Sequence, residues 1–304
     1  MELVECVPNL SEGQRPDVMD TIQAAAESVS GIALLDRHAD AVHNRMVLTM
    51  AGTPGRVAEA AFRAVASATQ SIDLTMHRGV HPRIGAADVV PFVPIGSTSM
   101  QLCIELAQRV GRRIAAELDL PVYLYAEAAT RGDRRRLPDL RRGEYEFFAA
   151  HIGEDPRLEP DFGSARIGPA GAVAVGARPP LVAYNITLDS SDLSIARAIA
   201  RTIRESSGGL PAVQARGFLT ADPRVVQVSM NLLDLRRTPL HVVFERVRVE
   251  AEHRGVSVLE SELVGLLPAD ALVQLGREYL RFGQLDPSAV LETRLLEAAL
   301  TANQ

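Results

Sequence analysis

The sequence predicts an α/β protein, more narrowly an α+β sandwich, with two subdomains that each pack helices on one face of a mixed β-sheet. Short apolar runs of strand length alternate with segments of helical period along nearly the whole chain. The second half carries them in the order βαββαβ, which is typical of a ferredoxin-like sandwich. The first half follows the same order and adds one helix and one strand.

Length and composition fit two subdomains. The chain has 304 residues, 47% of them hydrophobic and 23% charged, with a formal net charge of -6. These proportions exclude a disordered tail, a collagen-like repeat and a disulfide-stapled miniprotein. A domain usually takes roughly 100–200 residues, so we expect one subdomain over 1–178 and a second over 179–304.

Capping residues and apolar runs define the elements of the first half. Ser11, Pro54 and Ser99 stand where three helices can begin. Pro8 and Asn9 are expected to end the first strand, and two prolines make 87–95 an edge or irregular strand. The predicted strands cover 2–7, 32–36, 46–52, 87–95 and 121–128, and the predicted helices 15–29, 57–72 and 100–117.

Residues 130–170 show no period, which indicates a functional loop, a linker or a solvated surface excursion. The second half is more regular, with glycines where its helices end. Its predicted strands cover 181–188, 213–220, 225–234 and 256–266, its predicted helices 191–207 and 240–255, and further helices follow from about Asp270.

Several classes of function are excluded by residues that are missing. The sequence has no lysine, which excludes Schiff-base catalysis and a Walker-A phosphate loop. Its acidic balance argues against a nucleic-acid partner. Cys6 and Cys103 are too few for a disulfide framework, and no apolar run reaches the 18 or so residues of a membrane span. We therefore expect a cytoplasmic protein with no membrane partner, and the apolar, strand-rich halves suggest a homodimer.

Four of the seven histidines fall between residues 38 and 81, in connections next to predicted elements. The first group runs from Asp36 through His38 and Asp40 to Arg45, and the second is 77–85, HRGVHPRIG. Three interpretations stay open: a metal site, structural histidines bonded to backbone, and acid–base catalysis. The spacing matches no familiar metal motif, so no metal is expected.

Acid–base chemistry has the clearest physical basis at His81. An imidazole has an unperturbed pKa of roughly 6.5, close to working pH. Pro82 restricts the chain after this histidine, and the guanidinium of Arg83 would keep the ring neutral and basic.

A second informative stretch runs from Asp161 to Gly171. Its glycines would let the backbone approach a flat ligand closely. The spacing is not that of a dinucleotide fingerprint, and no predicted strand immediately precedes it. By itself the stretch is a weak signal.

Eight collinear segments resemble the glutamate formimidoyltransferases, and 81–94, HPRIGAADVVPFVP, is the most specific of them. The segments cover nearly the whole chain in order: 4–13, 76–95, 121–129, 140–146, 160–163, 175–188, 228–234 and 261–268. The resemblance implies transfer of a formimidoyl group between N-formimidoyl-L-glutamate and N5 of tetrahydrofolate, a step of histidine breakdown. It also implies folate bound between two α/β subdomains.

The resemblance further assigns residues. His81 matches the family's general base. The folate-contacting segment matches Gly163, Ser164, Ala165, Arg166, Ile167, Gly168, Pro169, Ala170 and Gly171, one residue fewer than in the animal enzymes. His38 stands where the animal enzyme has an acidic residue, so Asp36 or Asp40 is expected to supply the carboxylate. The animal protein continues into a cyclodeaminase domain, whereas this sequence ends at Gln304 and resembles the stand-alone form.

Both substrates carry carboxylates, which arginine binds with two hydrogen bonds. Arg45 and Arg83 flank the histidine groups and are the first candidates, and Arg166 and Arg178 are the second. Any one of them could equally be a solvated surface charge. His77 is expected to support the site indirectly or to be a polar loop residue.

Three other functions remain open at this point. A 5-formyltetrahydrofolate–glutamate formyltransferase would use the same base. A non-catalytic folate-binding protein would keep the binding site and lose the chemistry. An α/β interaction module would bind no folate.

Overall fold

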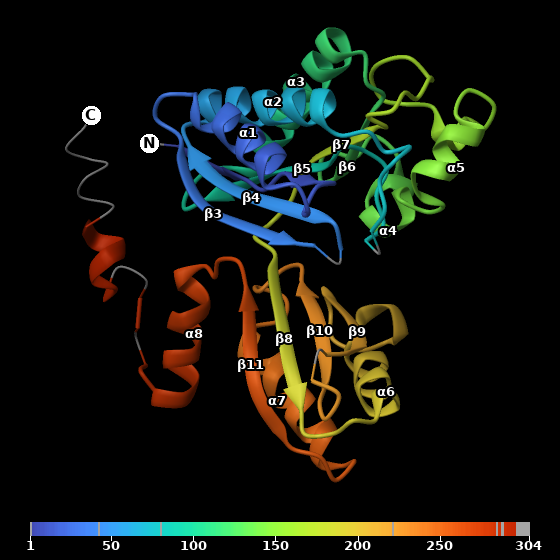
Figure 1. Cartoon of the computed structure of the whole chain (residues 1–304). Helices are drawn as coiled ribbons and strands as arrows, with labels where there is room; N and C mark the ends of the chain where they lie inside the picture. The colour runs from blue at the N-terminus through green and yellow to red at the C-terminus, as the bar shows by residue number, and fades with distance from the viewer. Residues whose placement is uncertain are drawn as a thin grey trace. The chain divides into compact units, whose positions relative to one another are not determined.

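The computed structural model describes residues 2–41, 43–79, 81–220, 222–283, 285–286 and 289–295. The chain divides into two compact units, Met1–Arg178 (unit 1) and Pro179–Gln304 (unit 2) (Figure 1). Each unit combines a sheet with helices, and the predicted fold class is confirmed.

Unit 1 is built on a seven-stranded sheet. Its order is β3–β4–β1/β2–β5–β7–β6, in which β1 and β2 both pair with β4 and β5 and so form one interrupted strand. The pairs among β1 to β5 are antiparallel, and β5, β7 and β6 run parallel. The strands are β1 (Leu3–Cys6), β2 (Asn9–Leu10), β3 (Ala33–Asp40), β4 (Arg45–Gly52), β5 (Ala87–Ile95), β6 (Val122–Ala126) and β7 (Val173–Ala177). This is the ferredoxin-like order extended by two parallel strands.

Three helices cover one face of that sheet: α1 (Pro16–Glu27), α2 (Pro54–Ser71) and α3 (Met100–Leu118) (Figure 1). Each begins where a proline or capping serine stands, and Ser99 accepts a 3.2 Å hydrogen bond from the backbone N of Leu102. The core between helices and sheet consists mainly of Ala, Val, Leu, Ile and Met, as the composition requires.

The segment predicted to lack a pattern covers the opposite face of β5, β6 and β7. It folds into short helices η1 (Gly132–Arg134), α4 (Leu137–Leu140), α5 (Glu144–His151) and η2 (Pro156–Leu158). A second buried cluster forms there, in which the rings of Tyr123 and Phe148 meet edge to face with centroids 5.4 Å apart. The expectation of helices on one face only is therefore wrong for unit 1. Strand β6 is buried on both faces because both faces of these parallel strands are covered.

Two other expectations for unit 1 are wrong. Strand β5 is central, and its prolines are tolerated because Pro91 lies opposite the break between β1 and β2 while Pro94 lies beyond the last pair with β7. Pro8 and Asn9 interrupt the first strand but do not end it, since Asn9–Leu10 forms β2. Strand β7 was not predicted, because its sequence, VAVGA, is short and made largely of small residues.

Unit 2 is a four-stranded sheet in the order β11–β8–β10–β9. All its pairs are antiparallel, where a mixed sheet was expected. The strands are β8 (Val182–Leu188), β9 (Val213–Leu219), β10 (Val226–Leu232) and β11 (Val258–Val264). Helices α6 (Leu193–Ile203) and α7 (Leu240–Glu252) pack on one face, η3 (Glu205–Ser207) follows α6, and α8 (Ala269–Leu280) follows β11 (Figure 1). This is the predicted βαββαβ unit. No helix in the described parts of the chain is both long enough and apolar enough to cross a membrane.

The second core of unit 1 provides a stability test. Phe148 is fully buried, whereas its neighbour Phe147 is half-buried. Phe148→Ala should lower the free energy of unfolding by about 3–5 kcal/mol because it leaves a cavity against Tyr123. Phe147→Ala should cost less than about 2 kcal/mol. Urea denaturation followed by circular dichroism measures both, and equal losses would contradict the described packing.

Candidate active site

The histidine loop of unit 1 is the connection between α2 and β5, residues 73–86, and it is bound at both of its ends to the glycine-rich segment 163–171. Backbone hydrogen bonds join Leu74 N to Pro169 O (2.7 Å) and Ala86 N to Ala170 O (2.8 Å). At the end of the loop, a Cβ on Gly85 would lie 1.8 Å from the carbonyl oxygen of Ala172. Only glycine permits this approach, so the two segments that the sequence singled out meet through their backbones.

The glycine-rich segment is itself anchored at both ends. At its start, the carboxylate of Asp161 accepts hydrogen bonds from Leu124 N (2.8 Å) and from Nη1 of Arg134 (2.6 Å). At its end, Gly171 has φ +73°, and a Cβ there would lie 2.3 Å from the carbonyl oxygen of Ile84. Gly168 and Pro169 between these anchors are exposed. The segment is thus a fixed ledge beside the histidine loop.

His81 lies against the guanidinium of Arg45, whose Nη1 contacts the ring Nε2. Burial is the first cause, and the positive charges of Arg45 and Arg141 the next, that lower the pKa of His81 to about 2. The ring is therefore neutral, and Nε2 accepts the hydrogen bond from Arg45. The cation that keeps it neutral comes from β4 and α4–α5, rather than from Arg83 as the sequence suggested.

Arg45 and Arg141 form a buried cationic pair behind His81. Burial and the charge of Arg141 lower the pKa of Arg45 to about 10. Arg141 pairs with Asp88, which is 3% exposed and also accepts the backbone N of Ile84 at 2.8 Å. The Nε atoms of both arginines are buried and have no hydrogen-bond partner within the part of the chain that the structure describes. One carboxylate thus acts on two guanidiniums, as an ion pair with Arg141 and through its charge on Arg45, which leaves capacity to bind an anion.

A narrow pocket brings the histidine groups together. Its lining residues come from β2, the β3–β4 hairpin, the histidine loop and β5: Asn9, Leu10, Ser11, His43, Asn44, Arg45, His77, His81, Arg83 and Asp88. An open groove adjoins it and shares His77 and Arg83 as lining residues. Titratable groups from three parts of the chain, the hairpin, the histidine loop and β5, therefore line one small space.

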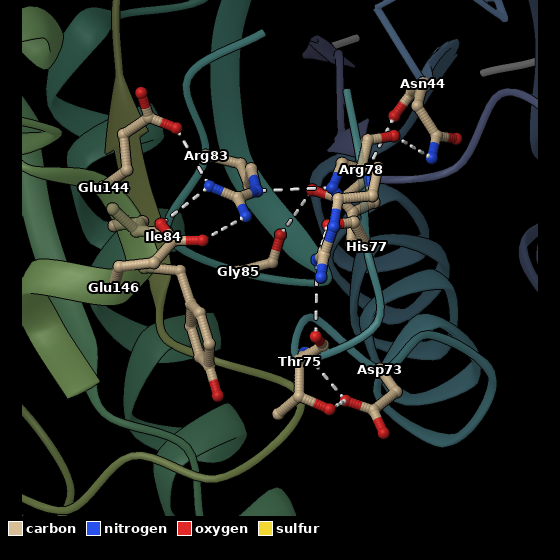
Figure 2. Close-up of polar contacts among 12 residues, drawn as sticks. Asn44, Asp73, Thr75, His77, Arg78, Arg83, Ile84, Gly85, Glu144 and Glu146 are labelled. Atoms are coloured by element: carbon tan, nitrogen blue, oxygen red, sulfur yellow. Dashed lines mark hydrogen bonds and ion pairs between the residues drawn. The ribbon is translucent and has the colours of Figure 1, made fainter. Parts of the chain in front are cut away.

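Arg83 is held between two carboxylates and a histidine (Figure 2). Its Nη1 and Nη2 lie 2.9 Å from Glu144 and 2.6 Å from Glu146, and its Nε donates to Nδ1 of His77 at 3.3 Å. The opposite ring nitrogen of His77 then carries the proton and donates to the carbonyl oxygen of Asn44 at 3.1 Å. Burial lowers the pKa of His77, so the buried ring stays neutral. Arg83 and His77 together hold the β3–β4 hairpin.

The acidic residues of the first group take separate positions on β3. Asp40 binds His43, with its Oδ2 at 2.7 Å from Nδ1. His38 is exposed, and Asp36 is half-buried. Both lie opposite residues of β4 in the strand register, His38 opposite Val47 and Asp36 opposite Thr49.

The two remaining arginine candidates differ. Arg166 is exposed on the glycine-rich segment. Arg178 follows the end of β7, donates its backbone N to Phe92 at 3.1 Å and bonds to the phenol of Tyr125. Burial raises the pKa of Tyr125 to about 12, so this phenol stays neutral between Arg178 and Arg141.

Sequence reasoning missed several residues of the pocket. The motif LRRGEYE was noticed as a segment, but Arg141, Glu144 and Glu146 had no assigned role. His43 stood within the first histidine group without one. Asp88 belongs to the most specific block of the sequence, and a carboxylate at the start of an apolar strand was the signal available. Within the described residues no group of three or more His, Cys, Asp or Glu could hold a metal ion.

Comparison with known proteins assigns the chain to a family. Residues 3–178 match the N-terminal subdomain of the formiminotransferase domain, and residues 183–300 match the formiminotransferase domain. The glutamate formimidoyltransferase of Thermoplasma acidophilum is 44% identical over 98% of this chain and 99% of its own length. The glutamate formimidoyltransferase of Streptococcus pyogenes serotype M1 is 43% identical over 97% of this chain and 99% of its own length.

The formimidoyltransferase-cyclodeaminase of Gallus gallus is 43% identical over 92% of this chain. The match spans 53% of that longer protein. The resemblance inferred from the eight sequence segments is confirmed.

The charge environment of His81 provides a direct test. In the wild-type protein its ring should not titrate between pH 5 and 8, because its pKa lies at about 2. Arg45→Gln removes a lowering charge, so the pKa of His81 should rise. NMR titration of the ring protons, assigned with His81→Gln, measures both values, and titration near 6.5 in the wild type would contradict the described site.

The same shift affects stability. The folded pKa lies below the ordinary value of 6.5, so the unfolded chain binds this proton first as the pH falls. His81 should therefore reduce stability increasingly below about pH 6.5, and less so in Arg45→Gln.

Proposed function

The chain belongs to the formiminotransferase family, and from this membership we propose that it transfers the formimidoyl group between N-formimidoyl-L-glutamate and N5 of tetrahydrofolate. Tetrahydrofolate is the co-substrate, and the reaction is a step of histidine breakdown and one-carbon metabolism. The observation that carries the proposal is a neutral His81 beside buried guanidiniums and next to the glycine-rich segment.

The chemistry requires two proton transfers. N5 attacks the amidine carbon, and the π electrons of the C=N bond move to the imino nitrogen. The tetrahedral intermediate collapses when the bond from that carbon to the glutamate nitrogen breaks. In sum, N5 loses one proton and the departing glutamate nitrogen gains one. A neutral imidazole placed at the reacting carbon can take the first proton, and His81 has that role.

A substrate carboxylate is the anion that Arg45 and Arg141 lack. Their partnerless Nε atoms are the available donors. A carboxylate bound there would take over the hydrogen bond that Arg45 gives to His81 and leave Nε2 with a free lone pair. It would also offset the charges that lower the pKa of His81. Donor binding would thereby make the base competent.

Arg83 has a different role from the one the sequence suggested. Its guanidinium is 9% exposed and is occupied by Glu144, Glu146 and His77. It is a positioning residue, since it holds His77 and through it the hairpin that carries Arg45. Asp36 and His38 have no assigned part in the chemistry.

The folate is expected along the glycine-rich segment, from Gly163 to Gly171. Exposed Gly168 and Pro169 offer backbone without large side chains, which suits a flat pterin or aminobenzoyl ring. Arg166, exposed on the same segment, is the candidate for a folate carboxylate, and Arg178 remains a second candidate.

Two finer points complete the proposal. Cys6 and Cys103 are buried free thiols, which fits a reducing compartment such as the cytoplasm. A homodimer is proposed from the apolar side chains exposed on α8, including Leu272, Tyr279 and Leu280. Transfer of a formyl group between 5-formyltetrahydrofolate and glutamate is the alternative reaction, since formyl and formimidoyl differ by O in place of NH.

The test of function is a product assay. Purified protein is mixed with tetrahydrofolate and either N-formimidoyl-L-glutamate or N-formyl-L-glutamate, and folate products and glutamate are quantified by mass spectrometry. We expect formimidoyl transfer, and a loss of about 10²–10⁴-fold in His81→Ala. Transfer from the formyl donor alone would identify the alternative reaction. Folate binding without product would identify a non-catalytic folate-binding protein. If the protein bound no folate, both the transferase and the folate-binding functions would be excluded.

Adjacent arginines test the carboxylate site. Arg141 is 11% exposed beside Asp88, whereas Arg142 is 82% exposed and pairs with Asp139. Arg141→Gln should raise KM for the formimidoyl donor about 10–100-fold, because a charge-assisted contact of about 1.5–3 kcal/mol is lost. Arg142→Gln should change it less than about twofold. Steady-state kinetics on variants with unchanged circular dichroism measure this, and equal effects would rule out the assignment.

A further inference from the structure

The hairpin between β3 and β4 carries a second histidine into the pocket of His81. Asp40 holds His43 twice: its Oδ1 accepts the backbone N at 2.9 Å, and its Oδ2 lies 2.7 Å from the ring Nδ1. Asn44, at φ 48°, fixes the hairpin by accepting Gly13 N at 2.9 Å and donating to Arg78 O at 2.8 Å. The ring is therefore oriented although its side chain is 46% exposed.

The two rings lie beside each other in the lining of the pocket. The centroids of His43 and His81 are 6.3 Å apart, and the rings meet edge to face. Both line the same pocket with Arg45. A formimidoyl carbon with its two nitrogens is small enough to be reached by both.

Their surroundings are opposite in charge. His81 accepts a hydrogen bond from a guanidinium, which keeps its ring neutral with the lone pair on Nε2, the form in which a base starts. His43 faces a carboxylate at Nδ1, which leaves Nε2 for the pocket. When His43 carries two protons, Asp40 accepts one N–H and a substrate nitrogen can accept the other.

We propose that His43 is a second catalytic residue, the acid that protonates the departing glutamate nitrogen, and that Asp40 is its positioning residue. The inference rests on the proposed formimidoyl transfer and adds a division of the two proton transfers between two histidines. His81 takes the proton that N5 loses. His43 gives its Nε2 proton to the glutamate nitrogen as the bond from that nitrogen to the formimidoyl carbon breaks. The net change is one proton moved from N5 to glutamate, and the two rings regain their starting states by exchange with water.

The test separates acid catalysis from a structural role. His43→Gln removes the acid, and His38→Ala is the matched control, because His38 is an exposed histidine on the same hairpin. Two donors are compared, N-formimidoyl-L-glutamate and its 3-fluoroglutamate analogue. Fluorine makes the departing amine less basic, so it leaves with less help from an acid.

We expect kcat of His43→Gln to fall about 10²-fold with the ordinary donor and markedly less with the fluorinated donor, with KM nearly unchanged. His38→Ala should behave as the wild type with both donors. Asp40→Asn should show the same donor dependence with a smaller loss. Added imidazole should restore part of the activity of His43→Ala, since the side chain is accessible.

Three outcomes would overturn the inference: unchanged kcat in His43→Gln, equal losses with the two donors, or an equal loss in His38→Ala. If His43→Gln loses its native circular dichroism, the donor comparison in Asp40→Asn decides in its place. Absence of formimidoyl transfer by the wild-type protein would instead overturn the proposed function, which keeps the two failures distinct.

Discussion

The contact between the backbones at Gly85 and Gly171 is the constraint on which the site depends. A Cβ at either position would lie within 2.3 Å of a carbonyl oxygen of the other segment. Because the segments touch without side chains between them at this point, the histidine loop is held against the glycine-rich ledge at its end, and the bond from Leu74 N to Pro169 O holds its start. The start of α5 joins the same assembly, since Tyr145 N donates to Arg83 O at 2.9 Å. The loop, the ledge and the start of α5 are thus joined to one another, and the loop carries His77, His81 and Arg83 into the pocket.

The positive charges around the pocket are not all matched by negative ones. Arg83 forms ion pairs with two carboxylates, so its side chain has a structural role. Arg141 pairs with Asp88, whose charge also acts on Arg45, and the Nε atoms of both arginines have no hydrogen-bond partner among the described residues. A buried guanidinium without its full set of acceptors costs stability, and proteins accept that cost where a ligand supplies the missing acceptor. Burial, and after it the charges of Arg45 and Arg141, lower the pKa of His81, so the cations proposed to bind an anionic substrate also act on the base.

Two histidines in one pocket can divide acid and base work only if their surroundings differ. Here the difference comes from neighbouring strands. Arg45 begins β4 and lies against His81, while Asp40 ends β3 and holds His43. Asp40 and Arg45 are themselves register partners across the hairpin. A single tight hairpin thereby supplies the positive partner to one ring and the negative partner to the other.

Local patterns in the sequence located most of the elements and the region of the site. Period and capping residues are local properties, and they predicted the long helices, most of the strands, the βαββαβ order and the two segments that meet at Gly85 and Gly171, but not the short helices α4 and α5. Strand β7 escaped because Ala and Gly carry little pattern, and β5 was misjudged as an edge because the sequence does not show what lies opposite a proline. The ion-pair and hydrogen-bond partners of charged side chains could not be predicted from local sequence patterns either. Arg83 meets residues of α5, and Arg45 meets His81 and Arg141, at separations of 36 to 63 residues for the bonded pairs. Such pairings depend on the strand order and on how the connections fold over the sheet. The tertiary structure was therefore needed to distinguish Arg83, which positions the loop, from Arg45 and Arg141, which are proposed to bind a substrate carboxylate.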